Sequence, residues 1–195
     1  MSVTAESSKY LTYPIPNSEL IKVLKMQKHP EGGYFVETDR QSEQVPSPFA
    51  DGALRSLATS IYYLLTPDAG VGVFHMNKSA TMHVLHQGRA EYTLITPGNP
   101  PTVEIKIMGP NIHAGETLQL LVGTGVWKKS RLIPEDLEAA RKDRAKEDYT
   151  GCLITEVVFP GFHWEDHDFL NQTKLKELFH GDKEFEKYLE FVKEG

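Results

Sequence analysis

The stretch VFHMNKSATMHVLHQG, residues 73–88, decides the predicted fold. It contains two short strand-like runs, VFHM and TMHVLHQ, on either side of a turn at Asn77 and Lys78, and it closes on Gly88. Similar runs, each ended by Pro, Gly, Asn or Asp, follow one another from residue 56 to residue 161. Many short strands at this spacing, with few helices between them, are typical of an antiparallel sandwich or barrel. We therefore expect an all-β protein.

The segments outside these strands have different patterns. Residues 1–16 are polar and then rich in Tyr and Pro, which predicts an arm lying on a surface. A short helix is expected between residues 17 and 27, and the charged run at 134–148 predicts a solvated helical insertion. The tail, residues 171–195, has apolar side chains at helical spacing, so we expect it to form helices that pack on the barrel. A single domain then spans residues 17–170.

Composition limits the classes of function. The chain has 195 residues and 39% apolar content, which suits one domain with a sizeable core. A formal net charge of -6, without a run of Lys or Arg, excludes a surface built for nucleic acid. Cys152 is the only cysteine, so no intramolecular disulfide can form, and its apolar surroundings predict a packed thiol. Without a signal-peptide pattern or a membrane-length apolar run, we expect a cytoplasmic protein with no membrane partner.

The histidines of the opening stretch lie at strand spacing. His75 and Asn77 share one face of the first strand, and Thr81 shares a face of the second strand with His83. His86 points away from His83. If the shared faces point inward, these polar side chains enter the lumen, where small β-barrels hold ligands. The alternative is that they are edge or turn residues that face water.

The same stretch is similar in register to the first motif of the cupin superfamily, which carries two histidines, a glutamate and a glycine. The matching positions here are held, in order, by His75, Asn77, Thr81 and Gly88. The second cupin motif, a glycine turn followed by a histidine, resembles residues 123–125, with Lys128 at the histidine position. Only one of the four metal-ligand positions therefore keeps its residue type.

A closer resemblance extends over about residues 28–170. The segments HPEGGYFVETDR, SIYYLLTPD, GVWKKSRL and EVVFPGFHWEDHDFL together resemble a small family of uncharacterised cupins related to the rhamnose-pathway sugar-nucleotide epimerase. This resemblance implies a cupin jelly-roll barrel, with a short N-terminal helix, a helical insertion and C-terminal helices. Bacterial members keep a glutamate at the Thr81 position and a tryptophan at the His83 position, so this chain is a variant of the pattern.

Ligand chemistry disfavours a metal cofactor. Zn, Fe and Mn sites need several imidazole or carboxylate donors, whereas amides and hydroxyls are poor ligands and a charged ammonium is none. A cation at Lys128 would repel a metal ion. His83 and Glu156 are the remaining donors that could complete such a site, and we expect no tightly bound metal.

Acid–base chemistry can use the same residues without a metal. The expected set has His75 or His83 as base, Lys128 as electrophile, and Tyr63 or Tyr34 as proton donor. It resembles the cupin sugar-nucleotide epimerases, in which a histidine base and a tyrosine acid act without metal. The residues assigned to substrate binding are Tyr34, Asn77, Thr81, Gln119 and Glu156.

Other polar and aromatic residues have simpler interpretations. Glu156 is equally well explained as an outward-facing carboxylate on a half-exposed strand. Trp127 and Trp164 are expected to be packing or rim residues. The cluster at residues 165–168 indicates a surface turn. The cations available for the phosphates of a nucleotide sugar are Lys128, Lys129, Arg131 and Arg55.

Three functional hypotheses follow. The first is a metal-independent isomerase or epimerase acting on a small carbonyl compound or sugar derivative in the lumen. The second is a protein that binds or stores a small molecule without turnover, and the third is a metal-dependent oxygenase or isomerase. We also expect a homodimer, because cupins commonly pair through their sheets and the N-terminal arm could be exchanged between subunits.

Overall fold

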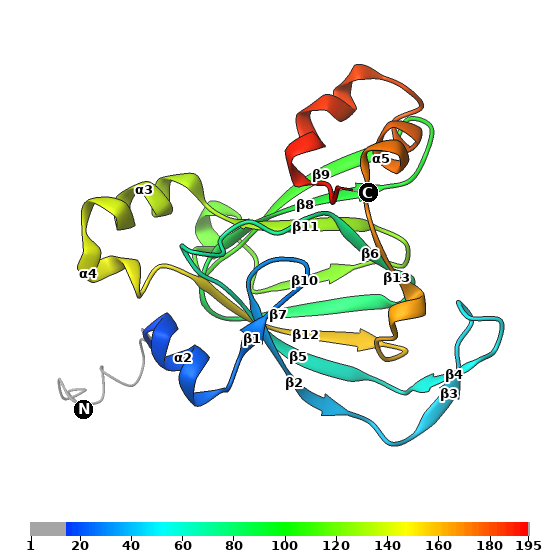
Figure 1. The fold of residues 1–195 in the computed structure, drawn as a ribbon, viewed down its shortest axis with the longest axis horizontal. Helices are drawn as coiled ribbons and strands as arrows, with labels where there is room; N and C mark the ends of the chain where they lie inside the picture. Colours follow the sequence, from blue (N-terminus) through cyan, green and yellow to red (C-terminus); the bar gives the residue numbers. More distant parts are fainter. Residues whose placement is uncertain (1–14, 195) are drawn as a thin grey trace.

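Two antiparallel sheets face each other in the computed structural model, which describes residues 15–194 (Figure 1). The larger sheet has six strands in the order β1-β2-β5-β12-β7-β10, and the smaller has five in the order β13-β6-β11-β8-β9. The six strands are β1 (Gln27–Lys28), β2 (Tyr34–Arg40), β5 (Thr59–Leu65), β7 (Ala80–Gly88), β10 (Gln119–Val122) and β12 (Cys152–Phe159). The five strands are β6 (His75–Asn77), β8 (Ala90–Thr96), β9 (Thr102–Met108), β11 (Trp127–Leu132) and β13 (His167–Phe169).

Shorter elements decorate the two sheets. A hairpin of β3 (Gln44–Pro46) and β4 (Leu54–Ser56) extends from one end of the barrel (Figure 1). The remaining short elements are the 3-10 turns η1 (Ile112–Ala114) and η2 (Trp164–Asp166). Of the predicted N-terminal arm, residues 1–14 lie outside the described part of the chain. Within residues 15–194, none of the helices combines the length and the apolar content of a membrane span.

The opening stretch crosses from one sheet to the other. Its first strand, β6, pairs with β11 and β13, whereas its second strand, β7, pairs with β10 and β12. The two strands are therefore not hydrogen-bonded to each other, although only a short turn separates them. His75 and His83 both face the lumen because the two sheets face each other across it.

The lumen is apolar at one end and contains polar side chains toward the other. One end is filled by apolar side chains, including Leu65, Leu132, Cys152 and Ile154. The alternation of β12 brings Cys152, Ile154, Glu156 and Val158 to the same face, so the carboxylate enters the lumen beyond the apolar plug. Burial raises the pKa of the Cys152 thiol to about 12, which agrees with the predicted packed thiol.

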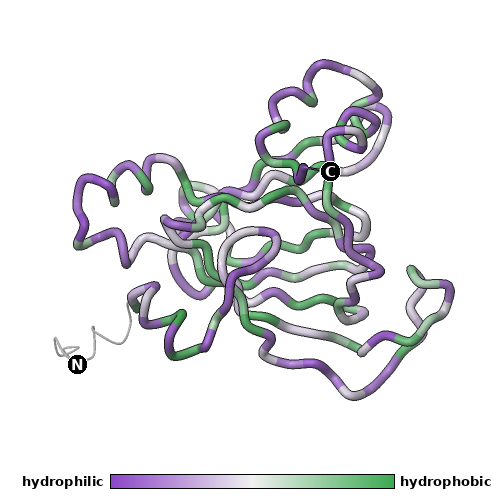
Figure 2. Tube along the Cα trace, in the orientation of Figure 1, coloured by the Kyte–Doolittle hydropathy of each residue, from purple (hydrophilic) through white to green (hydrophobic). Residues whose placement is uncertain are grey.

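Helices cover the outer faces. Helix α2 (Asn17–Val23) packs Leu20 against Leu64 and Leu153 on the six-stranded sheet. At the C-terminus, α5 (Gln172–Leu178) and η3 (Lys183–Phe191) cover the five-stranded sheet (Figure 1). The insertion consists of α3 (Pro134–Lys142) and α4 (Arg144–Glu147), which are mostly hydrophilic (Figure 2). The barrel with a few peripheral helices confirms the fold class expected from the sequence.

Candidate active site

A buried lysine, glutamate and histidine meet in the lumen from three strands. Glu156 on β12 lies opposite His83 on β7, and Lys128 reaches them from β11 of the other sheet. The Lys128 ammonium donates to Oε1 of Glu156 at 2.6 Å, and its Nζ lies 2.9 Å from Nε2 of His83. The same Nε2 lies 3.0 Å from Oε2 of Glu156. The three side chains form a closed cluster.

Electrostatics in this cluster favour an ionised carboxylate beside a neutral imidazole. Burial alone would raise the pKa of Glu156, but the Lys128 ammonium and His83 lower it well below the ordinary value. Burial lowers the pKa of His83, and the nearby Lys128 lowers it further. Nδ1 of His83 has no hydrogen-bond partner among the described residues. Glu156 is therefore charged at neutral pH, and Lys128 compensates its charge.

A second buried carboxylate, Glu31, is surrounded by histidines. Nε2 of His167 donates to Oε1 of Glu31 at 2.7 Å. Nε2 of His75 lies 3.0 Å from Oε2, within ion-pair distance but outside hydrogen-bond geometry, and its Nδ1 donates to the Val73 carbonyl at 2.9 Å. The rings of His75 and His167 are stacked, with centroids 5.7 Å apart. Burial would raise the pKa of Glu31, but His75 and His167 hold it well below the ordinary value.

A glycine turn brings Glu31 into the barrel. Gly32 and Gly33 adopt φ of +102° and +73°, in the left-handed region that favours glycine. A Cβ on Gly33 would lie 2.7 Å from the Leu64 carbonyl and 3.1 Å from the Tyr63 phenol. The Glu31 carbonyl accepts the amide of Val73 at 2.9 Å. Two glycines are therefore needed here, because a side chain at either position would prevent the turn from approaching the sheet closely enough to place the Glu31 carboxylate in the lumen.

His29, at the start of the same turn, lines the lumen and can donate a hydrogen bond from its ring to a ligand there. Burial lowers its pKa, so the imidazole is neutral at neutral pH. The backbone amide of Glu31 donates to Nδ1 of His29 at 3.2 Å, which leaves the ring proton on Nε2.

The open end of the lumen forms a cavity of about 380 Å³, at the lower end of the volumes of small-molecule sites. Its polar wall includes His29, Glu31, Asn77 and Glu156. Its apolar wall includes Phe35, Ile61, Val158, Phe162 and Trp164. A much smaller void of about 10 Å³ lies deeper, beside Tyr63, His75 and Lys128. Glu31 and Glu156 line both the cavity and the small void. The two carboxylates therefore lie between the cavity and the deeper side chains Tyr63, His75 and Lys128.

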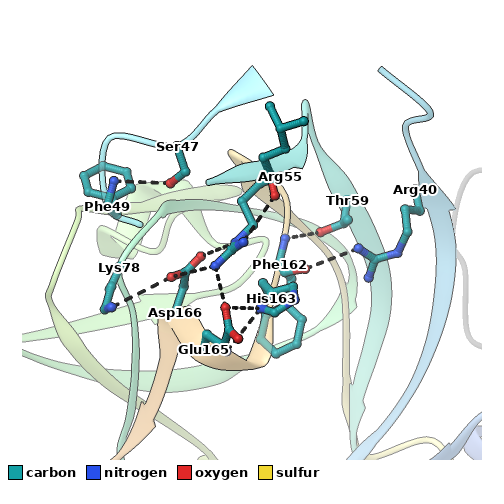
Figure 3. Close-up of polar contacts among 11 residues, drawn as sticks. Arg40, Ser47, Phe49, Arg55, Thr59, Lys78, Phe162, His163, Glu165 and Asp166 are labelled. Atoms are coloured by element: carbon teal, nitrogen blue, oxygen red, sulfur yellow. Dashed lines mark hydrogen bonds and ion pairs between the residues drawn. The ribbon is translucent and has the colours of Figure 1, made fainter. Parts of the chain in front are cut away.

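Polar contacts fix the rim of the cavity. Arg55, from β4, donates to Asp166 at 2.7 Å and to Glu165 at 3.0 Å (Figure 3). The amide of Phe162 donates to Thr59 Oγ1 at 2.9 Å, and Arg40 donates to the Phe162 carbonyl at 3.3 Å (Figure 3). The segment between β12 and β13 is therefore attached to β2, β4 and β5.

Comparisons with known proteins identify the family. A family model described as cupin superfamily (DUF985) matches residues 18–170. The chain belongs to this cupin family. An uncharacterized protein of Saccharomyces cerevisiae is 36% identical over 192 residues, which cover 91% of this cupin and 90% of the yeast protein. The family resemblance expected from the sequence is confirmed.

Solved structures share the fold of this cupin. A hypothetical protein from Leishmania major superposes with a TM-score of 0.76 at 25% identity, covering 92% of this chain and 100% of that chain. A protein from Shewanella oneidensis superposes with a TM-score of 0.71 at 22% identity, covering 93% and 99% of the two chains.

Seven of the site residues expected from the sequence point into the lumen. They are Tyr63, His75, Asn77, Thr81, His83, Lys128 and Glu156. Glu156 lines the cavity, whereas His83, one of the two expected bases, is fully buried and does not line it. His75, the other expected base, lines the deeper void instead. Burial raises the pKa of Tyr63, so its phenol stays protonated in the deep void.

Two expected residues lie elsewhere. Tyr34 is on the outer face of β2, where its hydroxyl donates to Asp68 at 2.7 Å and its ring packs with the α2 cluster. Gln119 is exposed on β10, whereas the next residue, Leu120, faces the core. Strand alternation accounts for both placements, since each lies next to an inward-facing residue, and neither belongs to the candidate site.

The interpretation of residues 165–168 as a surface turn is wrong for its central part. Asp166 is buried against Arg55, and His167 begins β13 with a side chain that is only 2% exposed. Sequence reasoning also missed His29 and Glu31, although both lie in the HPEGGY segment that carries the family resemblance. The paired glycines after Glu31 were the available signal, because they indicate a close backbone approach.

The cations expected to hold phosphate groups are used inside the protein. Lys128 pairs with Glu156, and Arg55 pairs with Asp166. Arg131 pairs with Glu91 at 2.8 Å on the outer side of the sheet. Lys129 also points outward, with Nζ 3.9 Å above the Phe191 ring. None of these four side chains lines the larger cavity.

The donor set at the cupin motif positions does not fit a metal ion. The Lys128 ammonium lies within 2.9 Å of both candidate donors, His83 and Glu156, so a positive charge already lies between them. In residues 15–194, no group of three or more His, Cys, Asp or Glu side chains has an arrangement that could hold a metal.

Proposed function

We propose that this cupin is an acid–base isomerase that moves a proton next to the carbonyl group of a small molecule bound in the lumen. The observation that carries the proposal is Glu156, a buried carboxylate paired with a lysine at the wall of a largely apolar cavity. Its negative charge is held in place by Lys128 and His83. A positioned carboxylate of this kind is the base in enolisation chemistry.

The reaction needs only groups on this chain. Glu156 takes the proton from the carbon beside the carbonyl, and the C–H electron pair forms a carbon–carbon double bond while charge moves to the carbonyl oxygen. Nε2–H of His29 donates a hydrogen bond to that oxygen. Glu156 then returns the proton to the adjacent carbon, while the hydroxyl proton moves between the two oxygens. No oxidant or reductant is required.

Lys128 has a distinct role in this scheme. A carboxylate with a lowered pKa is a weak base, so the reaction depends on stabilising the negative charge that develops on the substrate. When Glu156 becomes neutral by accepting the proton, the positive charge of Lys128 is no longer compensated. The Lys128 charge then attracts the negative enediolate in the cavity. This attraction stabilises the intermediate more than the bound substrate.

Deuterium exchange tests the proposal. The protein is incubated in deuterated water with a panel of hydroxyketones, aldoses and ketoses, and loss of the carbon-bound proton is followed by NMR. We expect enzyme-dependent exchange that falls at least about 100-fold in Glu156→Gln. Glu91→Gln, which removes a carboxylate paired with Arg131 outside the cavity, is the matched control and should keep the rate. Equal rates in the two variants, or saturable binding without exchange, would overturn the proposal, and the second result would identify a binding protein.

A further inference from the structure

The geometry points to an uncharged, ring-shaped, hydroxylated ligand, an unphosphorylated monosaccharide or close analogue, bound with one ring face against Trp164. This inference deepens the proposed function, on which it rests for the reacting carbonyl. It assigns Trp164 to ligand binding, whereas the sequence indicated only a packing or rim residue.

Trp164 presents a fixed aromatic surface to the cavity. The side chain lines the cavity, is 55% exposed and contacts two neighbouring aromatic rings. Phe162 meets it edge to face at 4.9 Å, and His167 does so at 5.1 Å. An indole that is held by two neighbouring rings and is still more than half exposed offers apolar surface to a ligand, such as the C–H face of a sugar ring.

The segment that carries Trp164 is attached to the barrel on both sides. Before it, the amide of Gly161 donates to the Ser56 carbonyl at 2.7 Å, and Phe162 is bonded to Thr59. After it, Asp166 accepts from the buried guanidinium of Arg55 (Figure 3). The indole is therefore positioned before a ligand arrives, which lowers the entropy cost of binding.

Charge balance around the cavity selects an uncharged ligand. Glu156 is compensated by Lys128, and Glu37 at the rim accepts hydrogen bonds from Nη2 and Nε of Arg40, at 2.7 and 3.1 Å. Arg40 is the only Lys or Arg among the described residues that line the cavity. A phosphate or nucleotide diphosphate would thus meet Glu31 and Glu156 without an unpaired cation to receive it.

The polar wall suits hydroxyl groups. The carboxylates of Glu31 and Glu156 accept hydrogen bonds, and His29 donates one. Asn77 also lines the cavity, and its buried side-chain oxygen has no hydrogen-bond partner among the described residues. A buried amide oxygen of this kind is satisfied by a ligand donor such as a sugar hydroxyl.

Calorimetric titration with matched ligands tests the inference. Unphosphorylated aldoses and ketoses are compared with their phosphate esters on the full chain. We expect saturable binding of at least one neutral sugar and at least tenfold weaker binding of its phosphate ester. Trp164→Ala should weaken sugar binding by about tenfold, and Tyr149→Ala, which removes an exposed aromatic outside the cavity, should leave it unchanged.

The outcomes separate this inference from the proposed isomerase. Selective sugar binding that depends on Trp164, without deuterium exchange, retains the ligand class and overturns the enzyme. Exchange on phosphate esters as fast as on neutral sugars retains the enzyme and overturns the ligand class. Wild-type affinity in Trp164→Ala overturns the stacking role, and because this side chain is exposed, circular dichroism should show an intact fold.

Discussion

Lys128→Met measures how much the buried ion pair of Lys128 with Glu156 contributes to stability, because the substitution removes the ammonium while keeping most of the side-chain volume. Lys128 is 3% exposed, and its Nζ lies 2.6 Å from a carboxylate oxygen. At an effective dielectric constant near 20, a charge pair at this distance attracts by about 6 kcal/mol before desolvation is subtracted. Removing one partner of a buried pair costs about 3–5 kcal/mol, because the other charge stays buried and unpaired. We expect that loss in the free energy of unfolding at pH 7.

The pH dependence of the loss identifies its cause. In the native protein the pKa of Glu156 is lowered, so its contribution to stability is present above the ordinary pKa of 4.5 and is lost as the pH falls below it. Without Lys128, burial dominates and should raise this pKa above its ordinary value. The variant then loses stability as the pH rises through the raised pKa. The difference between the two proteins should therefore be largest at pH 7 and shrink toward pH 4.5.

Urea denaturation followed by circular dichroism measures both effects. Lys106→Met is the matched control, since Lys106 is an exposed lysine paired with Glu104 and should cost no more than about 1 kcal/mol. Adding Glu156→Leu to Lys128→Met should restore much of the loss, because no unpaired charge remains. A cost below about 1 kcal/mol for Lys128→Met, or a loss that is independent of pH, would refute the assignment of Lys128 and Glu156 as a buried ion pair.

Three other substitutions test the structure around the site. Gly33→Ala should destabilise the protein more than Gly115→Ala, by at least about 1 kcal/mol in urea denaturation, because both have positive φ but a Cβ would meet a carbonyl at Gly33 and open space at Gly115. Arg55→Met should destabilise the protein and speed proteolysis of the rim, since it removes the short ion pair of the buried Asp166 and leaves, among the described residues, only the Lys78 ammonium 3.8 Å away. Burial lowers the pKa of Lys129 from 10.5 to about 8, so native stability should rise between pH 8 and 10.5. Lys129→Met should remove that rise; an unchanged pH profile would contradict it.

Local patterns were sufficient for the barrel and for part of the lumen. Strand alternation and turn residues predict the strands, and the two-residue spacing of His75 with Asn77 and of Thr81 with His83 predicts which side chains share a face. The assignment of Tyr34 and Gln119 shows the limit of this reasoning. Alternation divides a strand into two faces, but the sequence alone does not always reveal which face is inward.

The sequence by itself determined the fold class, the buried cysteine and the departure from the cupin metal ligands, because each depends on residue type and on short-range periodicity. Only the tertiary structure decided how the site is organised. His167 reaches Glu31 across 136 positions of sequence, and the register of β12 on β7 sets Glu156 against His83. Such contacts arise from the pairing of distant strands, and no short-range pattern encodes which carboxylate lies beside which histidine.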